Sequence, residues 1–205
     1  MKITILGAGN MATGLSRRIA NTKHSLAIHG RDPAKTTALA RSVGASTDDR
    51  AIRGADVVVV ATGYADAVAA LRGLGDLSGK VVVDITNPLT ADFGDLTVGF
   101  NSSAAEEIQK AFPTAKVVKG FNTVFAQLLT AAPKVGGTQV PVYVAGDDGE
   151  AKRAVESLAA ELGFKPVDAG PLRNARLLEP LALLNIYLGY GAGHGTAIAP
   201  AWLGL

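Results

Sequence analysis

Short apolar runs rich in β-branched residues alternate with stretches of helical periodicity along most of the chain. Two of the runs, 56–61 and 80–85, show no polar alternation, which is typical of strands buried on both faces. Apolar residues at helical spacing predict a helix over 148–162, with Asp148 at its start and Gly163 beyond its end. We therefore expect an α/β fold, with a Rossmann-type doubly wound, mostly parallel sheet and a small C-terminal helical extension. The expected strands are 2–6, 25–29, 56–61, 80–85, 116–118, 141–145 and 165–168.

The rest of the pattern divides the chain into a large and a small part. Further helices are expected over 11–21, 33–43 and 172–188. Pro180 predicts a kink or break in the last of these, and the least regular region, 86–113, is expected to be a loop that lines a cleft. We predict a large Rossmann-type domain over 1–170 and a small helical segment over 171–205.

Composition excludes several classes of protein. The 205 residues include no cysteine, which removes disulfides, thiolate nucleophiles and zinc–thiolate sites, and no metal site is predicted. The formal net charge is +2 without any run of five like charges, so we expect no nucleic-acid partner. Glu179, Pro180 and Asn185 interrupt the most apolar tract, and a membrane helix needs about 20 nearly uninterrupted apolar residues. With no secretory signal visible, we expect a cytoplasmic protein without a membrane partner.

A glycine-rich turn follows the first expected strand and opens a helix. It fits the pattern G-x-G-x-x-A of dinucleotide-binding proteins. In that pattern Gly7 permits the tight turn, Gly9 lets the backbone approach a diphosphate, and Ala12 allows the helix to pack closely on the strand. Free amides at the helix N-terminus then face the phosphates. The predicted cofactor contacts of this segment are Gly7, Ala8, Gly9, Asn10 and Met11.

The end of the second expected strand favours NADP over NAD. NAD-specific proteins carry an acidic residue here, about 20 positions beyond the turn. This strand ends in His29-Gly30-Arg31 instead, and Asp32 is better explained as a helix cap. Arg31 can form paired hydrogen bonds with a ribose 2′-phosphate, and Lys35, one helical turn further, adds a second positive charge. The alternative is that both are solvated surface charges. We expect NADP(H), which makes 1–170 an NADP-binding Rossmann domain, and we expect 171–205 to form a dimer seam or part of an acceptor site.

Polar residues follow other expected strands at the sheet edge where open α/β folds bind ligands. The strand 56–61 leads into Thr62-Gly63-Tyr64, which we expect along the ribose. Asn87 supplies hydrogen bonds after the strand 80–85, and Pro88 stiffens a loop facing the nicotinamide, although Thr-Asn-Pro is also ordinary turn chemistry. The predicted contacts are Ala61, Thr62, Tyr64, Asn87 and Pro88 with the cofactor, and Pro88, Asn122 and Thr123 with the substrate.

Five short motifs, in order along the chain, connect it with a known family. They are Gly7-x-Gly9-Asn10-Met11-x-x-Gly14, Thr86-Asn87-Pro88, Lys116-Val117-Val118-Lys119-Gly120-Phe121-Asn122-Thr123, Val144-Ala145-Gly146-Asp147-Asp148 and Asp168-Ala169-Gly170-Pro171-Leu172. Nearly the whole chain resembles the deazaflavin (coenzyme F-420)-dependent NADP oxidoreductases and the related reductase domain of the six-transmembrane ferric reductases. The resemblance implies a homodimer and direct hydride transfer to a small redox acceptor. It also implies that Arg31 and Lys35 hold the 2′-phosphate beside the Gly30 amide, and that Asn87 and Pro88 lie at the nicotinamide.

One residue departs from the family pattern. Deazaflavin-using members tend to have histidine at the position of Asn122, whereas the ferric-reductase branch has Phe-Asn there, so a flavin or another hydride acceptor stays open. Hydride transfer between a nicotinamide and a flavin-type ring needs no strong acid or base, and we predict no catalytic side chain. Two alternatives are kept. One is an NADP-dependent reductase of small carbonyl or imine substrates, which usually needs a longer C-terminal helical domain; the other is a non-catalytic NADP-binding redox sensor.

Overall fold

The computed structural model describes residues 1–204, and seven strands within that range form one sheet. In order across the sheet they are β2 (Ser25–His29), β1 (Lys2–Leu6), β3 (Val57–Val60), β4 (Val81–Asp84), β5 (Lys116–Lys119), β8 (Pro141–Gly146) and β9 (Lys165–Asp168). Strands β5 and β8 are antiparallel, and all other neighbours are parallel. The chain reverses its direction of travel across the sheet between β1 and β3, which is where Rossmann folds bind ligands. The expected fold class is therefore confirmed.

The strand β3 shows why an unbroken apolar run fits this sheet. Val57 and Val59 join the hydrophobic cluster on one face, and Val58 and Val60 join the cluster on the other. All four valines are at most 3% exposed, because helices cover both faces. The prediction that 56–61 contains a central, doubly buried strand is confirmed.

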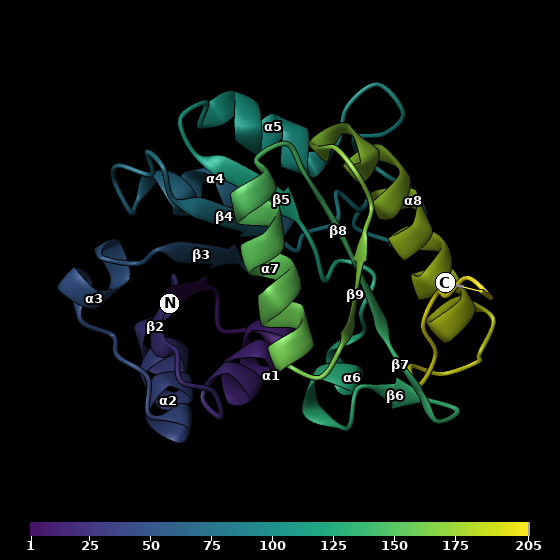
Figure 1. Cartoon of the computed structure of the whole chain (residues 1–205), viewed down its shortest axis with the longest axis horizontal. Coiled ribbons are helices and arrows are strands. Elements are labelled where there is room, and N and C mark those ends of the chain that lie inside the picture. The colour runs from purple at the N-terminus through teal and green to yellow at the C-terminus, as the bar shows by residue number, and fades with distance from the viewer. Residues whose placement is uncertain (205) are drawn as a thin grey trace.

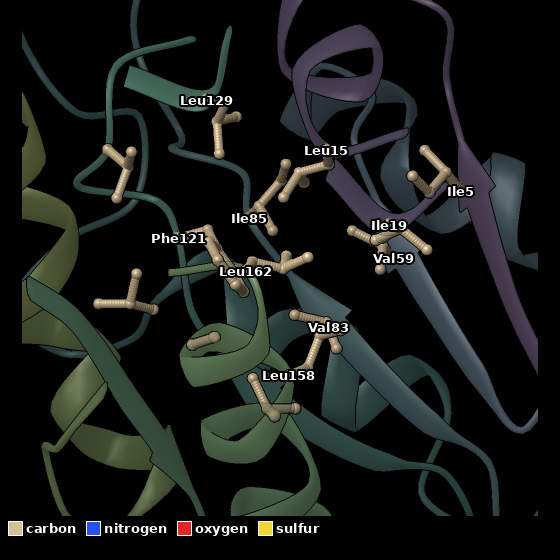
Figure 2. Close-up of a cluster of buried hydrophobic side chains, with 14 of the residues drawn as sticks. Ile5, Leu15, Ile19, Val59, Val83, Ile85, Phe121, Leu129, Leu158 and Leu162 are labelled. Atoms are coloured by element: carbon tan, nitrogen blue, oxygen red, sulfur yellow. The ribbon is translucent and has the colours of Figure 1, made fainter. Parts of the chain in front are cut away.

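Helices cover both faces of the sheet (Figure 1). They are α1 (Asn10–Ile19), α2 (Pro33–Val43), α3 (Asp49–Arg53), α4 (Tyr64–Arg72), α5 (Ala104–Ala111), α6 (Ala126–Thr130), α7 (Gly149–Glu161) and α8 (Ala175–Ile186). Buried residues of α1, α2, α6 and α7 belong to one hydrophobic cluster, and those of α3, α4 and α5 belong to the other. Figure 2 shows the first cluster, in which Leu15 of α1 and Leu158 of α7 lie on the same side of the sheet as Val83.

Aspartates cap three helices, and the caps of α2 and α7 agree with the sequence prediction. Asp32 Oδ1 accepts hydrogen bonds from the amides of Ala34 and Lys35 at 3.0 and 3.1 Å, and Pro33 is the first residue of α2. Asp148 begins α7 in the same way. Asp32 is therefore a helix cap.

The region 86–113 is more regular than the sequence pattern indicates. Its last third forms α5, and Ser103 Oγ accepts a hydrogen bond from the Glu106 amide at the start of that helix. The sequence pattern also did not reveal α3, α4, α6 or a separate hairpin of β6 (Lys134–Val135) and β7 (Thr138–Gln139). The irregular segment is therefore shorter than expected and runs from β4 to the start of α5.

The helix α8 lies along the β8–β9 side of the sheet (Figure 1). It continues from Ala175 to Ile186 through Pro180, so the helix is not broken there. Leu178 packs against Tyr143 of β8, whereas Leu184 is 53% exposed. No helix within residues 1–204 is long and apolar enough to cross a membrane.

Candidate nucleotide-binding site

The turn between β1 and α1 uses its two glycines differently. Gly7 has φ +122°, a conformation that favours glycine, and a Cβ there would lie 2.4 Å from the carbonyl oxygen of Ala61. A Cβ at Gly9 would have no described atom within 4 Å. The fold itself therefore requires glycine at position 7, whereas the space beside Gly9 is open to a ligand.

The N-terminus of α1 faces that open space. Gly9 is its N-cap residue, and no side chain in the described part of the chain caps it. The first amides of a helix lack partners within the helix, and the helix dipole makes this end attractive to anions. Ala12 is fully buried, and a Cβ at Gly14 would lie 2.5 Å from Cβ of Leu129, so small residues let α1 pack closely on its surroundings.

A cavity of about 560 Å³ opens beside the turn. It lies between the glycine turn, the end of β2 and the length of α4. The predicted cofactor contacts that line it are Gly7, Ala8, Gly9, Gly30, Arg31, Lys35, Ala61 and Thr62. Open backbone on one side and two cations on the other fit a dinucleotide with a phosphorylated ribose.

Each cation of this cavity faces a carboxylate. Arg31 Nη1 lies 3.3 Å from Asp66 Oδ2, and Lys35 Nζ lies 3.9 Å from Asp32 Oδ2. The Arg31 side chain is 88% exposed, and exposed ion pairs contribute only about 0–1 kcal/mol. A phosphate group can therefore take the place of Asp66 on Arg31 at little cost.

The predicted contacts after β4 and β5 lie outside this cavity but contact each other. Asn122 Nδ2 donates to Asn87 Oδ1 at 3.0 Å, and Asn87 Nδ2 donates to the Asn122 carbonyl at 2.9 Å. Phe121 is 2% exposed and has φ +59°, a strained conformation for a bulky residue. That conformation turns the chain sharply after β5, and the turn brings the two asparagine loops together.

Asn122 and Thr123 are more buried than an open cleft requires. They are 6% and 3% exposed, and both bind α8: Asn122 Nδ2 donates to the Leu178 carbonyl, and the Thr123 carbonyl accepts from Asn185 Nδ2. Asn122 Oδ1 and Thr86 Oγ1 are buried and have no hydrogen-bond partner among residues 1–204. Buried polar atoms normally have partners, so each of these two atoms keeps the capacity for one more hydrogen bond.

Three further predicted contacts also lie outside the cavity lining. Asn10 and Met11 are the first residues of α1; Asn10 is exposed, and Met11 packs against the core. Tyr64 is the first residue of α4 and is half-buried. Burial raises the pKa of its hydroxyl, and the nearby carboxylates of Glu107 and Glu179 raise it further. Tyr64 therefore stays protonated at neutral pH and can donate a hydrogen bond.

A buried ionic cluster lies behind the ends of β4 and β5. Lys119 Nζ donates to Asp84 Oδ2 at 2.8 Å, to Glu179 Oε1 at 2.7 Å and to the Thr86 carbonyl at 2.5 Å. Burial opposes the charge of Lys119, but the two carboxylates outweigh it and raise its pKa, so the lysine stays protonated. Burial raises the pKa of Glu179. Residues 1–204 contain no group of three or more acidic or histidine side chains that could hold a metal ion.

Comparisons with known proteins agree with the fold and the glycine turn. Residues 2–88 match the family model described as NADP oxidoreductase, coenzyme F420-dependent. The F420-dependent NADP reductase of Methanothermobacter marburgensis is 28% identical over an alignment of 208 positions, gaps included, that covers 92% of each chain. A crystal structure of a candidate F420-dependent NADP reductase from Arthrobacter sp. FB24 superposes with a TM-score of 0.87 at 32% identity, and the match covers 98% of this chain and 100% of that one. The chain belongs to the F420-dependent NADP oxidoreductase family.

Members and relatives of this NADP oxidoreductase family differ in length. Metalloreductase STEAP3 of Rattus norvegicus is 35% identical over 187 residues, which cover 89% of this chain. The chain spans only 37% of the length of that metalloreductase. These relatives place the chain among the NADP-dependent oxidoreductases and support NADP(H) as its nucleotide.

Sequence reasoning missed several polar residues around the site. No role was predicted for Asp66, which follows the third strand, or for Lys119, which belongs to one of the five motifs. A signal for the buried cluster is present, because Asp84 and Lys119 each follow buried valines at the end of a strand and Glu179 interrupts a largely apolar helix. Charges at such positions are almost never fully buried unless paired. Their pairing across the fold could have been suspected, but not the choice of partners.

Proposed function

We propose that this chain binds NADP(H) and transfers hydride between its nicotinamide and a deazaflavin or flavin-type acceptor. The observation that carries the proposal is the open backbone at Gly9, at an uncapped helix start, beside a cavity that also contains Arg31 and Lys35. Membership of the NADP oxidoreductase family supports both the nucleotide and the chemistry.

The adenine half of the nucleotide would be held by backbone and by cations. The amides of Gly9, Asn10 and Met11 would bind the diphosphate at the start of α1. Arg31 and Lys35 would bind the 2′-phosphate, because a guanidinium offers paired donors and an ammonium adds charge. Beside them, Gly30 would leave its amide accessible, and Ala61, Thr62 and Tyr64 would line the ribose.

The nicotinamide half would be positioned by the loops after β4 and β5. When bound, NADPH would supply the hydride, and water would supply the proton that completes reduction of a flavin-type ring, so the residues of the chain would bind and orient the rings without acting as acid or base. Asn87, held by Asn122, would fix the ring by hydrogen bonding, and the buried Pro88 would form a rigid apolar wall. The protein's part is to hold two rings in contact and to exclude water.

The acceptor would lie beside Pro88, Asn122 and Thr123. Coenzyme F420 stands in the name of the Methanothermobacter relative, which supports a deazaflavin. Asn122 occupies the position where deazaflavin-using members tend to have histidine, which supports a flavin instead. The proposal therefore covers both rings, and direct assay must choose between them.

An acceptor panel tests the proposed function. NADPH oxidation would be measured without oxygen against coenzyme F420, FMN, FAD, ferric chelates, and small carbonyl and imine compounds. We expect oxidation with one flavin-type ring and a preference for NADPH over NADH. Oxidation with carbonyl or imine compounds alone would make the chain a reductase of small substrates. Binding of NADPH without oxidation of any kind would indicate a non-catalytic redox sensor. Absence of NADPH binding would refute both the nucleotide and the hydride transfer.

We also propose that residues 171–205 contribute to a homodimer. Leu177, Leu184, Tyr187 and Trp202 are each more than half exposed on and after α8. An apolar groove of about 540 Å³ lies beside that helix, and exposed apolar patches of this kind mark interaction sites. Leu184→Glu should therefore shift a dimer to monomer in sedimentation velocity experiments, and an unchanged mass would refute the proposed dimer interface.

The cysteine-free composition supports a cytoplasmic location.

A further inference from the structure

The irregular segment 87–103 joins β4 to α5 and carries the loop proposed to face the nicotinamide. Its start is held by two charged side chains. Asp84 Oδ1 accepts from the Thr86 amide at 2.9 Å, and Lys119 Nζ donates to the Thr86 carbonyl at 2.5 Å. Both backbone hydrogen-bonding groups of Thr86, the residue before this segment, are therefore fixed.

The end of the same segment is held by Glu179 of α8. Glu179 Oε2 accepts from the Ala104 amide at 3.0 Å, and Oε1 accepts from the Ala105 amide at 3.4 Å. These are first-turn amides of α5, where a carboxylate also complements the helix dipole. Glu179 Oε1 also accepts from Lys119, so one buried cluster holds both ends of the segment and joins them to α8.

We propose that Lys119 and Glu179 are positioning residues, which fix segment 87–103 and thereby orient the nicotinamide half of the cleft. The identity of the ligand rests on the proposed function, but the anchoring is a property of the free protein. Stability alone does not account for such a cluster, because replacing buried ion pairs by apolar residues is often neutral or stabilising. Hydrogen bonds, however, are directional, and they fix where a backbone lies in a way that apolar contacts do not.

The anchored residue Thr86 also carries a buried hydroxyl. Thr86 is 4% exposed, and its Oγ1 has no partner within the described residues. The direction of this hydroxyl depends on the backbone that Asp84 and Lys119 hold. A change in the cluster should therefore affect contacts at the nicotinamide and leave the adenine half unchanged.

Hydrogen exchange of the free protein tests the anchoring directly. Glu179→Gln keeps the size and one acceptor oxygen but removes the charge that binds Lys119. We expect amides of segment 87–103 to exchange about tenfold faster, which corresponds to about 1.4 kcal/mol of local opening free energy, while β1 and β2 keep their protection. Unchanged exchange of the segment in the folded variant would overturn the proposal.

Glu106→Gln is a matched control for that experiment. Glu106 also joins α5 to α8, because it accepts from Arg176 at 2.6 and 2.8 Å, but its hydrogen bonds do not include Thr86. We expect faster exchange only around Ser103 and the first turn of α5. If Glu106→Gln loosened the whole segment as much as Glu179→Gln, the assignment to the buried cluster would be wrong.

Binding of a fragment separates positioning from general damage. 2′,5′-ADP carries the adenine half of NADP without the nicotinamide. In Glu179→Gln we expect the Kd of 2′,5′-ADP to stay within about twofold of the wild-type value. We expect the Kd of NADPH to rise, or the rate of hydride transfer to fall, by about tenfold, which is equivalent to about 1.4 kcal/mol. Equal weakening of both ligands would indicate general damage and overturn the proposal. If the wild-type chain did not bind 2′,5′-ADP, the proposed function would fail, and the exchange data would still decide the anchoring.

The wild-type chain provides the decisive measurement if Glu179→Gln does not fold. The Thr86 amide should then exchange as slowly as those of the buried strand β4, since its acceptor Asp84 is 0% exposed. Exchange of that amide as fast as in the exposed turn 92–95 would show that the cluster does not hold the segment.

Discussion

The two halves of the proposed nucleotide site differ in the groups that form them and in how buried those groups are. The adenine half, at the ends of β1 and β2, consists of backbone turns and solvated charges, and the Arg31 side chain is 88% exposed. The nicotinamide half, at the ends of β4 and β5, consists of buried side chains that bind one another, and Lys119 is 0% exposed. The first half is open and adaptable, whereas the second is fixed before any ligand arrives.

Because of this difference, we expect the adenine half to determine the affinity for the nucleotide and the nicotinamide half to determine the orientation of the reacting rings. Exposed cations and free amides gain their hydrogen bonds only when phosphate groups bind, so changes there should alter Kd. Buried groups are already bonded to each other, so changes there should alter the geometry of the reacting rings. Variants of the first half should therefore affect binding of 2′,5′-ADP and NADPH alike, while variants of the second should separate the two ligands.

Substitution of Gly9 should cause the largest effect. Gly9→Val places two methyl groups where the diphosphate would approach, and loss of two or more charge-assisted hydrogen bonds, each worth about 1.5–3 kcal/mol, predicts at least roughly 100-fold weaker binding. The fold should persist, because a side chain at Gly9 has open space and its φ of −85° is ordinary. Calorimetric titration with NADPH and 2′,5′-ADP measures the loss.

Gly7→Ala is the contrasting variant. The added Cβ would lie 2.4 Å from the Ala61 carbonyl oxygen at a φ that alanine rarely adopts, so the free energy of unfolding should fall. A stable Gly7→Ala together with a Gly9→Val that binds NADPH normally would show that the turn is ordinary and not a phosphate site.

The same contrast explains which parts the sequence could predict. The glycine turn and the Arg31–Lys35 pair are local patterns within short segments, and residues 7–9 line one cavity together with Arg31 and Lys35. The doubly buried strand β3 was likewise predicted correctly, because a run of valines can satisfy both faces of a covered sheet.

The nicotinamide half depends on contacts between residues far apart in the sequence, which no local pattern predicts. Lys119 and Glu179 are 60 positions apart, and Asn87 and Asn122 are 35 positions apart. The left-handed turn at Phe121 could not be expected either, because a phenylalanine with positive φ contradicts its own preference. The antiparallel placement of β8 and the helix α5 also depend on tertiary contacts, so they too escaped prediction.

Removal of the Arg31 guanidinium should produce the next largest effect. Arg31→Ala deletes hydrogen bonds to a charged group worth about 1.5–3 kcal/mol, so NADPH binding should weaken about 10- to 100-fold while NADH binding stays nearly constant. Competition titrations with both nucleotides give the ratio. Arg41→Ala is the control, because Arg41 lies in the last turn of α2 and does not line the cavity. An unaltered ratio in Arg31→Ala would refute the assignment of the 2′-phosphate site.

A smaller change with the opposite sign is expected at Asp66. Its carboxylate lies 3.3 Å from Arg31 and competes with a 2′-phosphate for that guanidinium. Asp66→Asn should therefore strengthen NADPH binding by about two- to fivefold at low salt, in line with the 0.2–1 kcal/mol typical of exposed pairs. The gain should shrink at high salt, because screening weakens exposed charges. Asp49→Asn, on an ion pair of α3 outside the cavity, should change nothing, and weaker binding in Asp66→Asn would mean that Asp66 itself contacts the nucleotide.

The smallest effect concerns how the ion pair between Glu106 of α5 and Arg176 of α8 responds to acid. Hydrogen bonding to Arg176 lowers the pKa of Glu106, against an opposing effect of burial, so the ionised carboxylate stabilises the fold. A lowered folded-state pKa gives stability that is present above the unfolded value, about 4.3 for glutamate, and is lost as pH falls through the folded value. Since the pair is partly exposed, Glu106→Gln should cost at most about 1 kcal/mol at neutral pH. Urea unfolding across pH should show this difference shrinking below about pH 4.3, whereas a difference that grew with acid would mean that Glu106 folds protonated.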